Sequence, residues 1–215
     1  MKKLIGSAAV AAMLAAGANA AIVKVDIYGE VEWNGIRTGV LNNSVVTGGS
    51  AVHISFLLDS TQFVNDPDFP TRGYFIDHAS FSASYGSVTV GMQNPYPYPS
   101  APFFVVRNND PMVDGFFLSN GTAWPFAPTT DVPGIFENFG TAFEVSYDVD
   151  RLSSLDIMGA LGSYDYTGMS TFYMATVDGG MDAMGILYTG MTISEVPAPA
   201  TMGLLLPLAF ARRRR

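Results

Sequence analysis

The sequence contains no cysteine among its 215 residues. Disulfide bonds, cysteine zinc sites and thiol nucleophiles are therefore excluded, and the fold depends on its hydrophobic core alone. Histidine is nearly absent as well, since only His53 and His78 occur. Both lie in strand-like patterns and no serine lies in a nucleophile-elbow motif, so we interpret them as surface or partly packed side chains rather than catalytic bases.

Positive charge is scarce in the body of the chain. Six of the 11 basic residues lie at the extreme ends, whereas all 19 acidic residues lie between Asp26 and Glu195. Residues 21–195 contain five basic and 19 acidic residues, which gives that segment a net charge of −14. A body of this charge is repelled by phosphate backbones, which argues against nucleic acid as a partner.

Helical periodicity is absent from the body, and alternation of apolar and polar residues takes its place. The full sequence has 48% hydrophobic and 14% charged residues, which is suited to one packed domain. The period of two predicts half-buried strands with one wet face at 23–33, 51–59 and 143–149. The predicted inward residues are Val23, Val25, Ile27, Val31, Trp33, Val52, Ile54, Phe56, Leu58, Phe143, Val145, Tyr147 and Val149.

The segment FSASYGSVTVGM at 81–92 predicts a β-hairpin. If Gly86-Ser87 is a two-residue turn, Tyr85 faces Val88, Ala83 faces Val90 and Phe81 faces Met92. The polar residues match too, with Ser84 opposite Thr89 and Ser82 opposite Gly91. A slip of one residue would destroy both sets of pairs, so the segment specifies its own register.

Short strands separated by many glycines predict an antiparallel β-sandwich, jelly-roll-like, over residues 21–195. A partly closed barrel is the alternative fold. Eight of the 13 prolines lie in 93–140, which predicts long ordered loops there. Asp178-Gly179-Gly180 is predicted to be a turn. Further strands are predicted at 102–107, 115–118, 154–159, 171–177 and 185–194.

Residues 1–20 are predicted to be a signal peptide. Lys2 and Lys3 form a positive start, an apolar run follows, and Ala18-Asn19-Ala20 is a small-x-small cleavage site. Export then requires a Sec translocon and a signal peptidase as partners. The alternative interpretation is an ordinary N-terminal helix, which leaves the abrupt change to strand alternation at Ala21 unexplained.

Residues 196–215 have the features of a second targeting signal. Val196-Pro197-Ala198-Pro199 precedes a short apolar run, and Arg212, Arg213, Arg214 and Arg215 end the chain. The apolar run is too short to be a firm membrane helix, and the arginines would hold it on the cytoplasmic side. The prolines keep the preceding motif extended and open to an enzyme. A C-terminal core helix with a basic cap is the alternative.

This ending resembles the PEP-CTERM sorting signal, in which a Val-Pro-Glu-Pro-like motif precedes an apolar helix and an arginine cluster. Ala198 departs from the pattern, because glutamate is usual there. The resemblance implies transient anchoring in the inner membrane, processing by exosortase, and delivery to the cell surface or outside the cell. It also implies a structural or adhesive role in an extracellular polysaccharide layer, without enzyme activity. A carbohydrate-binding or carbohydrate-cleaving jelly roll is the alternative function.

Three groups of side chains are candidates for chemistry. Glu30 and Glu32 share a strand face at about 7 Å, a separation that suits a glycosidase, although a solvated polar face is the simpler interpretation. Calcium is the one cofactor considered, with Asp66, Asp68 and Asp110 as candidate ligands in turn-like segments. The aromatic residues of the proline-rich segment are candidate sugar contacts, namely Tyr96, Tyr98, Trp124 and Phe126.

Overall fold

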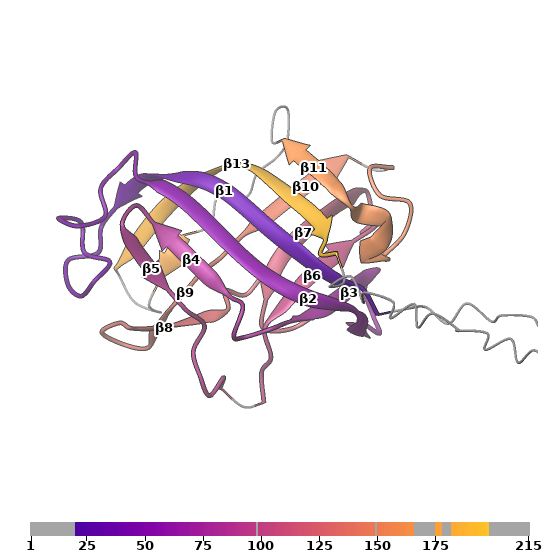
Figure 1. Ribbon diagram of the computed structural model, residues 1–215, viewed down its shortest axis with the longest axis horizontal. Helices are drawn as coiled ribbons and strands as arrows, with labels where there is room; N and C mark the ends of the chain where they lie inside the picture. The colour runs from indigo at the N-terminus through magenta and orange to yellow at the C-terminus, as the bar shows by residue number, and fades with distance from the viewer. Residues whose placement is uncertain (1–19, 98, 149, 166–174, 178–181, 198–215) are drawn as a thin grey trace, which may run out of the picture.

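A computed structural model gives the fold of the chain (Figure 1) and describes residues 20–97, 99–148, 150–165, 175–177 and 182–197. This part of the chain is all-β, as predicted, with a single short 3₁₀ helix, η1 (Ile157–Ala160). The strands are β1 (Ile22–Asn34), β2 (Ala51–Asn65), β3 (Thr71–Ile76), β4 (Ser82–Tyr85), β5 (Val88–Val90), β6 (Phe103–Arg107), β7 (Val113–Ser119), β8 (Thr129–Pro133), β9 (Asn138–Gly140), β10 (Glu144–Asp148), β11 (Gly162–Asp165), β12 (Ala175–Val177) and β13 (Ala183–Glu195).

All these strands belong to one antiparallel sheet, in which the three longest lie side by side. The main order is β10-β7-β6-β3-β2-β1-β13-β12-β9-β8. Valine and isoleucine alternate with polar residues along β1 and β2, so each strand buries one face over most of its length. These strands and β13 cross the molecule diagonally in Figure 1 and form the centre of the sheet.

The sheet branches at its long strands and curls on itself. β2 pairs with β4 through residues 52–55 and with β3 through residues 58–65. The isolated bridge between Met92 and Thr130 then connects the end of the β4–β5 hairpin to β8. Since β8 leads through β9 and β12 back to β13 and β1, one half of the sheet closes on itself.

The interior is one large apolar cluster that extends through both halves of the sheet, and Phe103, Val105 and Phe117 form a second, small cluster apart from it. The aromatic rings of Phe56 and Phe104 lie 5.6 Å apart, and those of Phe143 and Tyr188 lie 5.0 Å apart in an edge-to-face contact. In this way residues from distant strands fill the space that the curled sheet encloses. The core is therefore packed without any disulfide bond.

The local strand predictions are largely confirmed. In the hairpin, Tyr85 pairs with Val88, Ser84 with Thr89 and Ala83 with Val90. The four predicted inward residues of β2 are buried, and 102–107, 115–118 and 185–194 correspond to β6, β7 and β13. Part of the predicted strand 171–177 is found as β12.

Two details of these strands were predicted wrongly. The ladder between β4 and β5 ends at Val90, because the chain turns there to bridge Thr130, so Phe81 and Met92 are not paired in the hairpin. Trp33 is 44% exposed instead of buried. The β1–β13 register shifts between Val31 and Trp33, and such a bulge breaks the alternation of faces.

Two further predictions are corrected by tertiary contacts. Residues 154–159 form no strand, because the Asp156 carboxylate accepts a hydrogen bond from Met158 N and caps η1. The alternation in 143–149 predicts that Glu144 and Ser146 face solvent, but both are buried and contact Arg107. The segment 93–140 is mostly loop, as predicted, although β8 and β9 also lie in it. β3 and β11 were not predicted.

Several predicted features lie outside the described residues. They include Val149, the turn at Asp178-Gly179-Gly180, most of the signal peptide and the short C-terminal helix. In the part of the chain that the structure describes, no helix is long and apolar enough to cross a membrane. The jelly-roll-like sandwich is a finer description than a curled antiparallel sheet, and it stays a prediction.

Candidate functional site

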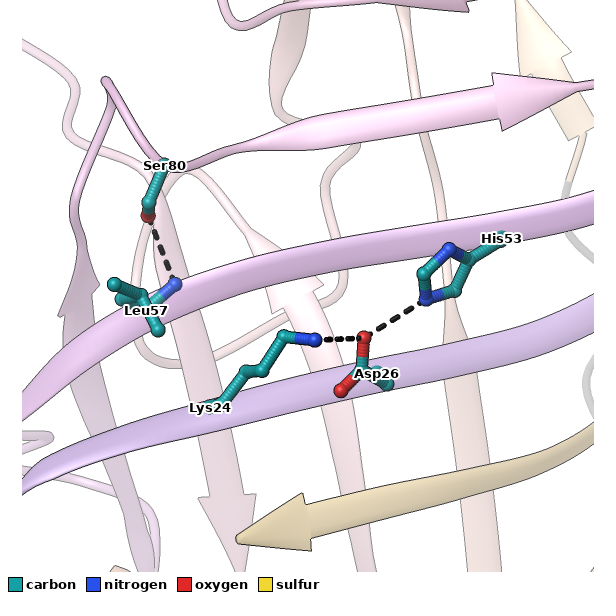
Figure 2. Close-up of polar contacts among 5 residues, drawn as sticks. All are labelled: Lys24, Asp26, His53, Leu57 and Ser80. Atoms are coloured by element: carbon teal, nitrogen blue, oxygen red, sulfur yellow. Dashed lines mark hydrogen bonds and ion pairs between the residues drawn. The ribbon is translucent and has the colours of Figure 1, made fainter. Parts of the chain in front are cut away.

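A group of ionisable side chains lies on the outer surface of β1 and β2. The Asp26 side chain lies between Lys24 Nζ, at 3.0 Å, and His53 Nε2, at 2.8 Å (Figure 2). Lys24 precedes Asp26 by two residues on the same strand face, whereas His53 comes from β2, where it pairs with Tyr28. Asp26 itself is only 7% exposed. The register of the two long strands therefore assembles one buried carboxylate between two nitrogen groups.

The carboxyl group of Asp26 is held in its ionised form. Burial raises the pKa of the Asp26 carboxyl group, but the hydrogen bonds from Lys24, His53 and Ser55 lower it by more than burial raises it. The net result is a pKa below the ordinary value of 3.8. The Asp26 carboxylate thus holds the side chains of Lys24 and His53 in place, and it is unsuited to act as a general acid.

This linkage predicts a specific effect of acid on stability. Because the pKa is lower in the folded state, the Asp26 carboxylate stabilises the fold above the unfolded-state pKa, and the contribution is lost as the pH falls through the folded-state value. Asp26→Asn removes this proton linkage, so its free energy of unfolding changes less between about pH 5 and pH 2 than that of the wild type. Urea denaturation at a series of pH values measures the difference. Ser55→Ala, which removes one donor, is expected to give an intermediate slope, and parallel curves for all three proteins would contradict the assignment.

The same surface carries a stacked pair of rings. Tyr28 and His53 lie 5.0 Å apart with an interplanar angle of 4°. On the other side of Tyr28, its partner on β13 is Gly190, which has no side chain. Tyr28 is 43% exposed, and one face of its ring stacks on His53. This arrangement suits contact with a flat ligand better than bond cleavage.

The Asp26–His53 pair does not extend to a nucleophile. Ser80 Oγ accepts a hydrogen bond from Leu57 N at 2.8 Å (Figure 2) and donates one to Asp77 O at 2.7 Å. Among the described residues, no hydrogen bond connects His53 to a hydroxyl group. An Asp-His-Ser hydrolase site is therefore not assembled in this part of the chain.

The predicted carboxylate pair is placed on the surface. Glu30 and Glu32 are both exposed on β1, beyond Tyr28. Glycosidase carboxylates must face a bound sugar from both sides of the scissile bond. Their exposure on β1 supports the simpler interpretation, a solvated polar face.

The predicted sugar contacts divide into two groups. Trp124 and Phe126 are 57% and 60% exposed, and the Trp124 ring packs edge-on against Phe69 at 5.3 Å. Tyr96 instead packs against the core, and its hydroxyl donates to Asn120 Oδ1 and accepts from Thr129 N. The Tyr96 ring therefore supports the proline-rich loop and is a poor sugar contact. Tyr98 lies outside the described residues.

Of the three candidate calcium ligands, Asp66 has a carboxylate that is engaged by hydrogen bonds within the chain. Asp66 accepts hydrogen bonds from Asp68 N, Phe69 N and Thr122 Oγ1. Asp110 lies in a different turn, where its N–H donates to Val113 O. Over the described ranges, no group of three acidic or histidine side chains is placed to hold a metal ion.

The two ends of the domain lie together. Val23 pairs with Glu195, and Val196 N donates to Ile22 O at 2.8 Å. Of the predicted cleavage and sorting residues, only Ala20, Val196 and Pro197 are described. Ala18, Ala198, Pro199 and the four terminal arginines lie outside the described residues.

Comparison with protein-family models, with curated proteins and with solved structures finds no match to this chain. Function must therefore be argued from its own residues.

Sequence reasoning missed the Lys24–Asp26–His53 group. The alternation of apolar and polar residues in both strands indicates that all three side chains lie on the polar faces. What was lacking was the register between β1 and β2, which sets Asp26 diagonally across from His53.

Proposed function

We propose that this chain is an exported bacterial protein that is sorted to the cell surface or the extracellular matrix and has a structural or adhesive role there. The observation that carries the proposal is the order of the C-terminal features, Val196–Pro199, an apolar run and four arginines. Signal peptidase and exosortase would process the two ends, with brief anchoring in the inner membrane between these steps.

The geometry of the domain supports this proposal. Because β1 and β13 pair along most of their length, both targeting segments leave the domain at the same end. The opposite end, with the loop 35–50 and the β8–β9 hairpin, then points away from an anchored terminus (Figure 1). The negative body also suits a protein that stays dissolved among acidic surface polymers. We further propose a jelly-roll-like sandwich as the finer description of the curled sheet, since β2 and β13 each pair with different partners along their two halves. The partly closed barrel is the alternative, and the half of the sheet that closes on itself favours it.

The test is the intact mass of the protein recovered from the cells that produce it. A species that begins at Ala21 and ends near Val196–Pro199, with or without an added group, is expected. A species that still ends at Arg215 would contradict sorting. In that case the tail would be a plain anchor or part of the domain.

Carbohydrate binding is the second candidate, because Trp124 and Phe126 expose more than half of their surface. Exposed rings on a rigid loop can stack on sugar rings. A glycan array discriminates the two candidates. Binding that is lost in Trp124→Ala and retained in Tyr96→Phe would favour the second, and an array without signal would favour the structural role.

A further inference from the structure

The curled sheet closes incompletely where the edge of β5 faces the edge of β8. We call this line between the two strand edges the seam. The Met92–Thr130 bridge is flanked by hydrogen bonds from Gln93 N to Thr129 O and from Asp131 N to Gly91 O. Continued in the same register, the next hydrogen-bonding pair would join Thr89 to Pro133. No ladder forms there, since among the described strands β5 pairs only with β4 and β8 only with β9.

The chain itself interrupts this ladder in two places. Gly134 N donates to Glu137 O, so Pro133 and Asn138 are a non-hydrogen-bonded pair and the Pro133 backbone faces β5. Proline has no N–H, so it cannot donate to the carbonyl of Thr89. One step earlier, Gly91 N donates to the Asp131 carboxylate at 3.0 Å. The two strand edges therefore separate after a single bridge.

A groove of ≈ 400 Å³ lies where the edges separate. Its walls are three residues of β5, three residues of β8 and the tip of the loop that joins β1 to β2. The lining residues are Gly39, Val40, Val88, Thr89, Val90, Asp131, Val132 and Pro133. All are apolar or small except Thr89 and Asp131, so the groove combines an apolar floor with one carboxylate.

The charge of the groove favours a basic occupant. Asp131 is exposed, and no cationic side chain of the described residues pairs with it. Residues 21–195 carry a net charge of −14, so a second copy of this domain would be repelled. A strand edge recognises extended backbone, and its floor and rim select alternate side chains.

We propose that this groove binds an extended peptide segment of a partner protein that carries a lysine or arginine between small apolar residues. The segment lies along the β5 edge. Its apolar side chains contact Val88, Val90 and Val132, and its basic side chain pairs with Asp131. The site lies at the end of the domain away from the start of β1 and the end of β13 (Figure 1). It does not depend on the sorting proposal.

The probe is a capped heptapeptide, acetyl-Ser-Val-Thr-Val-Lys-Val-Ser-amide, with a fluorophore for anisotropy measurements. Saturable one-to-one binding to the full chain is expected. The same peptide with glutamate in place of lysine is expected to bind about tenfold more weakly or less. Equal binding of the two peptides, or no saturable binding of the lysine peptide, would overturn the proposal.

Two variants test separately how the Asp131 charge and the open edges of β5 and β8 contribute to peptide binding. Asp131→Asn keeps an acceptor for Gly91 N and removes the charge, so it weakens the lysine peptide about threefold to tenfold. Glu137→Gln, on the same hairpin and outside the groove, is the matched control and leaves binding unchanged. Pro133→Val restores an N–H on the side of β8 that faces β5, so the seam closes and binding falls by about tenfold or more. Full binding by both Asp131→Asn and Pro133→Val would overturn the proposal.

Sedimentation of the chain without peptide tests the competing occupant. A single monomeric species over the concentration range is expected. Self-association that Pro133→Val abolishes would instead assign the groove to a second copy of this chain and overturn the proposed partner.

Discussion

Replacing Arg107 with methionine lowers the free energy of unfolding by about 3–5 kcal/mol. The guanidinium Nη2 lies 3.1 Å from Glu144 Oε1, and the two side chains are only 13% and 9% exposed. Without Arg107, the Glu144 carboxylate stays buried with no cation, and Ser146 loses its donor as well. Urea denaturation followed by circular dichroism measures the loss.

A double variant distinguishes the charge from simple packing. Arg107→Met with Glu144→Leu removes both charges, so most of the stability returns despite the additional substitution. Arg72→Met is the matched control, because Arg72 donates to Asn65 at an exposed site and its loss costs no more than about 1 kcal/mol. If the double variant were less stable than Arg107→Met alone, the uncompensated carboxylate would not be the cause.

Replacing Gly115 with alanine is expected to destabilise the protein by about 3 kcal/mol or more. A Cβ atom at this position would lie 2.2 Å from the backbone carbonyl oxygen of Val145. Gly115 belongs to β7 and pairs with Ser146 of β10, so the two strands would have to separate to admit one methyl group. The clash is with backbone, which cannot rotate away as a side chain does.

Gly121→Ala is the control for this substitution. No atom lies within 4 Å of a Cβ built at Gly121, so the change in stability stays within about 0.5 kcal/mol. Thermal unfolding of both variants beside the wild type makes the comparison. Equal midpoints for Gly115→Ala and the wild type would show that β7 and β10 are not in close contact at this point.

The hairpin and the buried face of β2 illustrate what was predictable. The pairs of Tyr85 with Val88 and of Ser84 with Thr89 are separated by a few residues, so their match could be checked within the segment. The alternation in β2 needed no knowledge of its neighbours, because one half-buried strand has the same pattern wherever it packs.

The candidate sites illustrate what was not predictable. Asp26 and His53 are 27 residues apart, and only the register of β1 and β2 brings them together. The groove depends on Pro133, which signals a break in pairing but does not reveal that β5 is the neighbour. The composition of its segment predicts a sugar contact for Tyr96, whereas the fold places its hydroxyl against Asn120.

By itself the sequence determined the fold class, the local strands and the absence of cysteine chemistry, because alternation and composition act on neighbouring residues. Only the tertiary structure decided that the sheet curls, that Arg107 covers a buried carboxylate, and that the seam between β5 and β8 stays open. These features depend on which distant strands become neighbours and in which register. The pairing of distant strands and its register minimise the free energy of the whole core, and no single segment of the sequence specifies them.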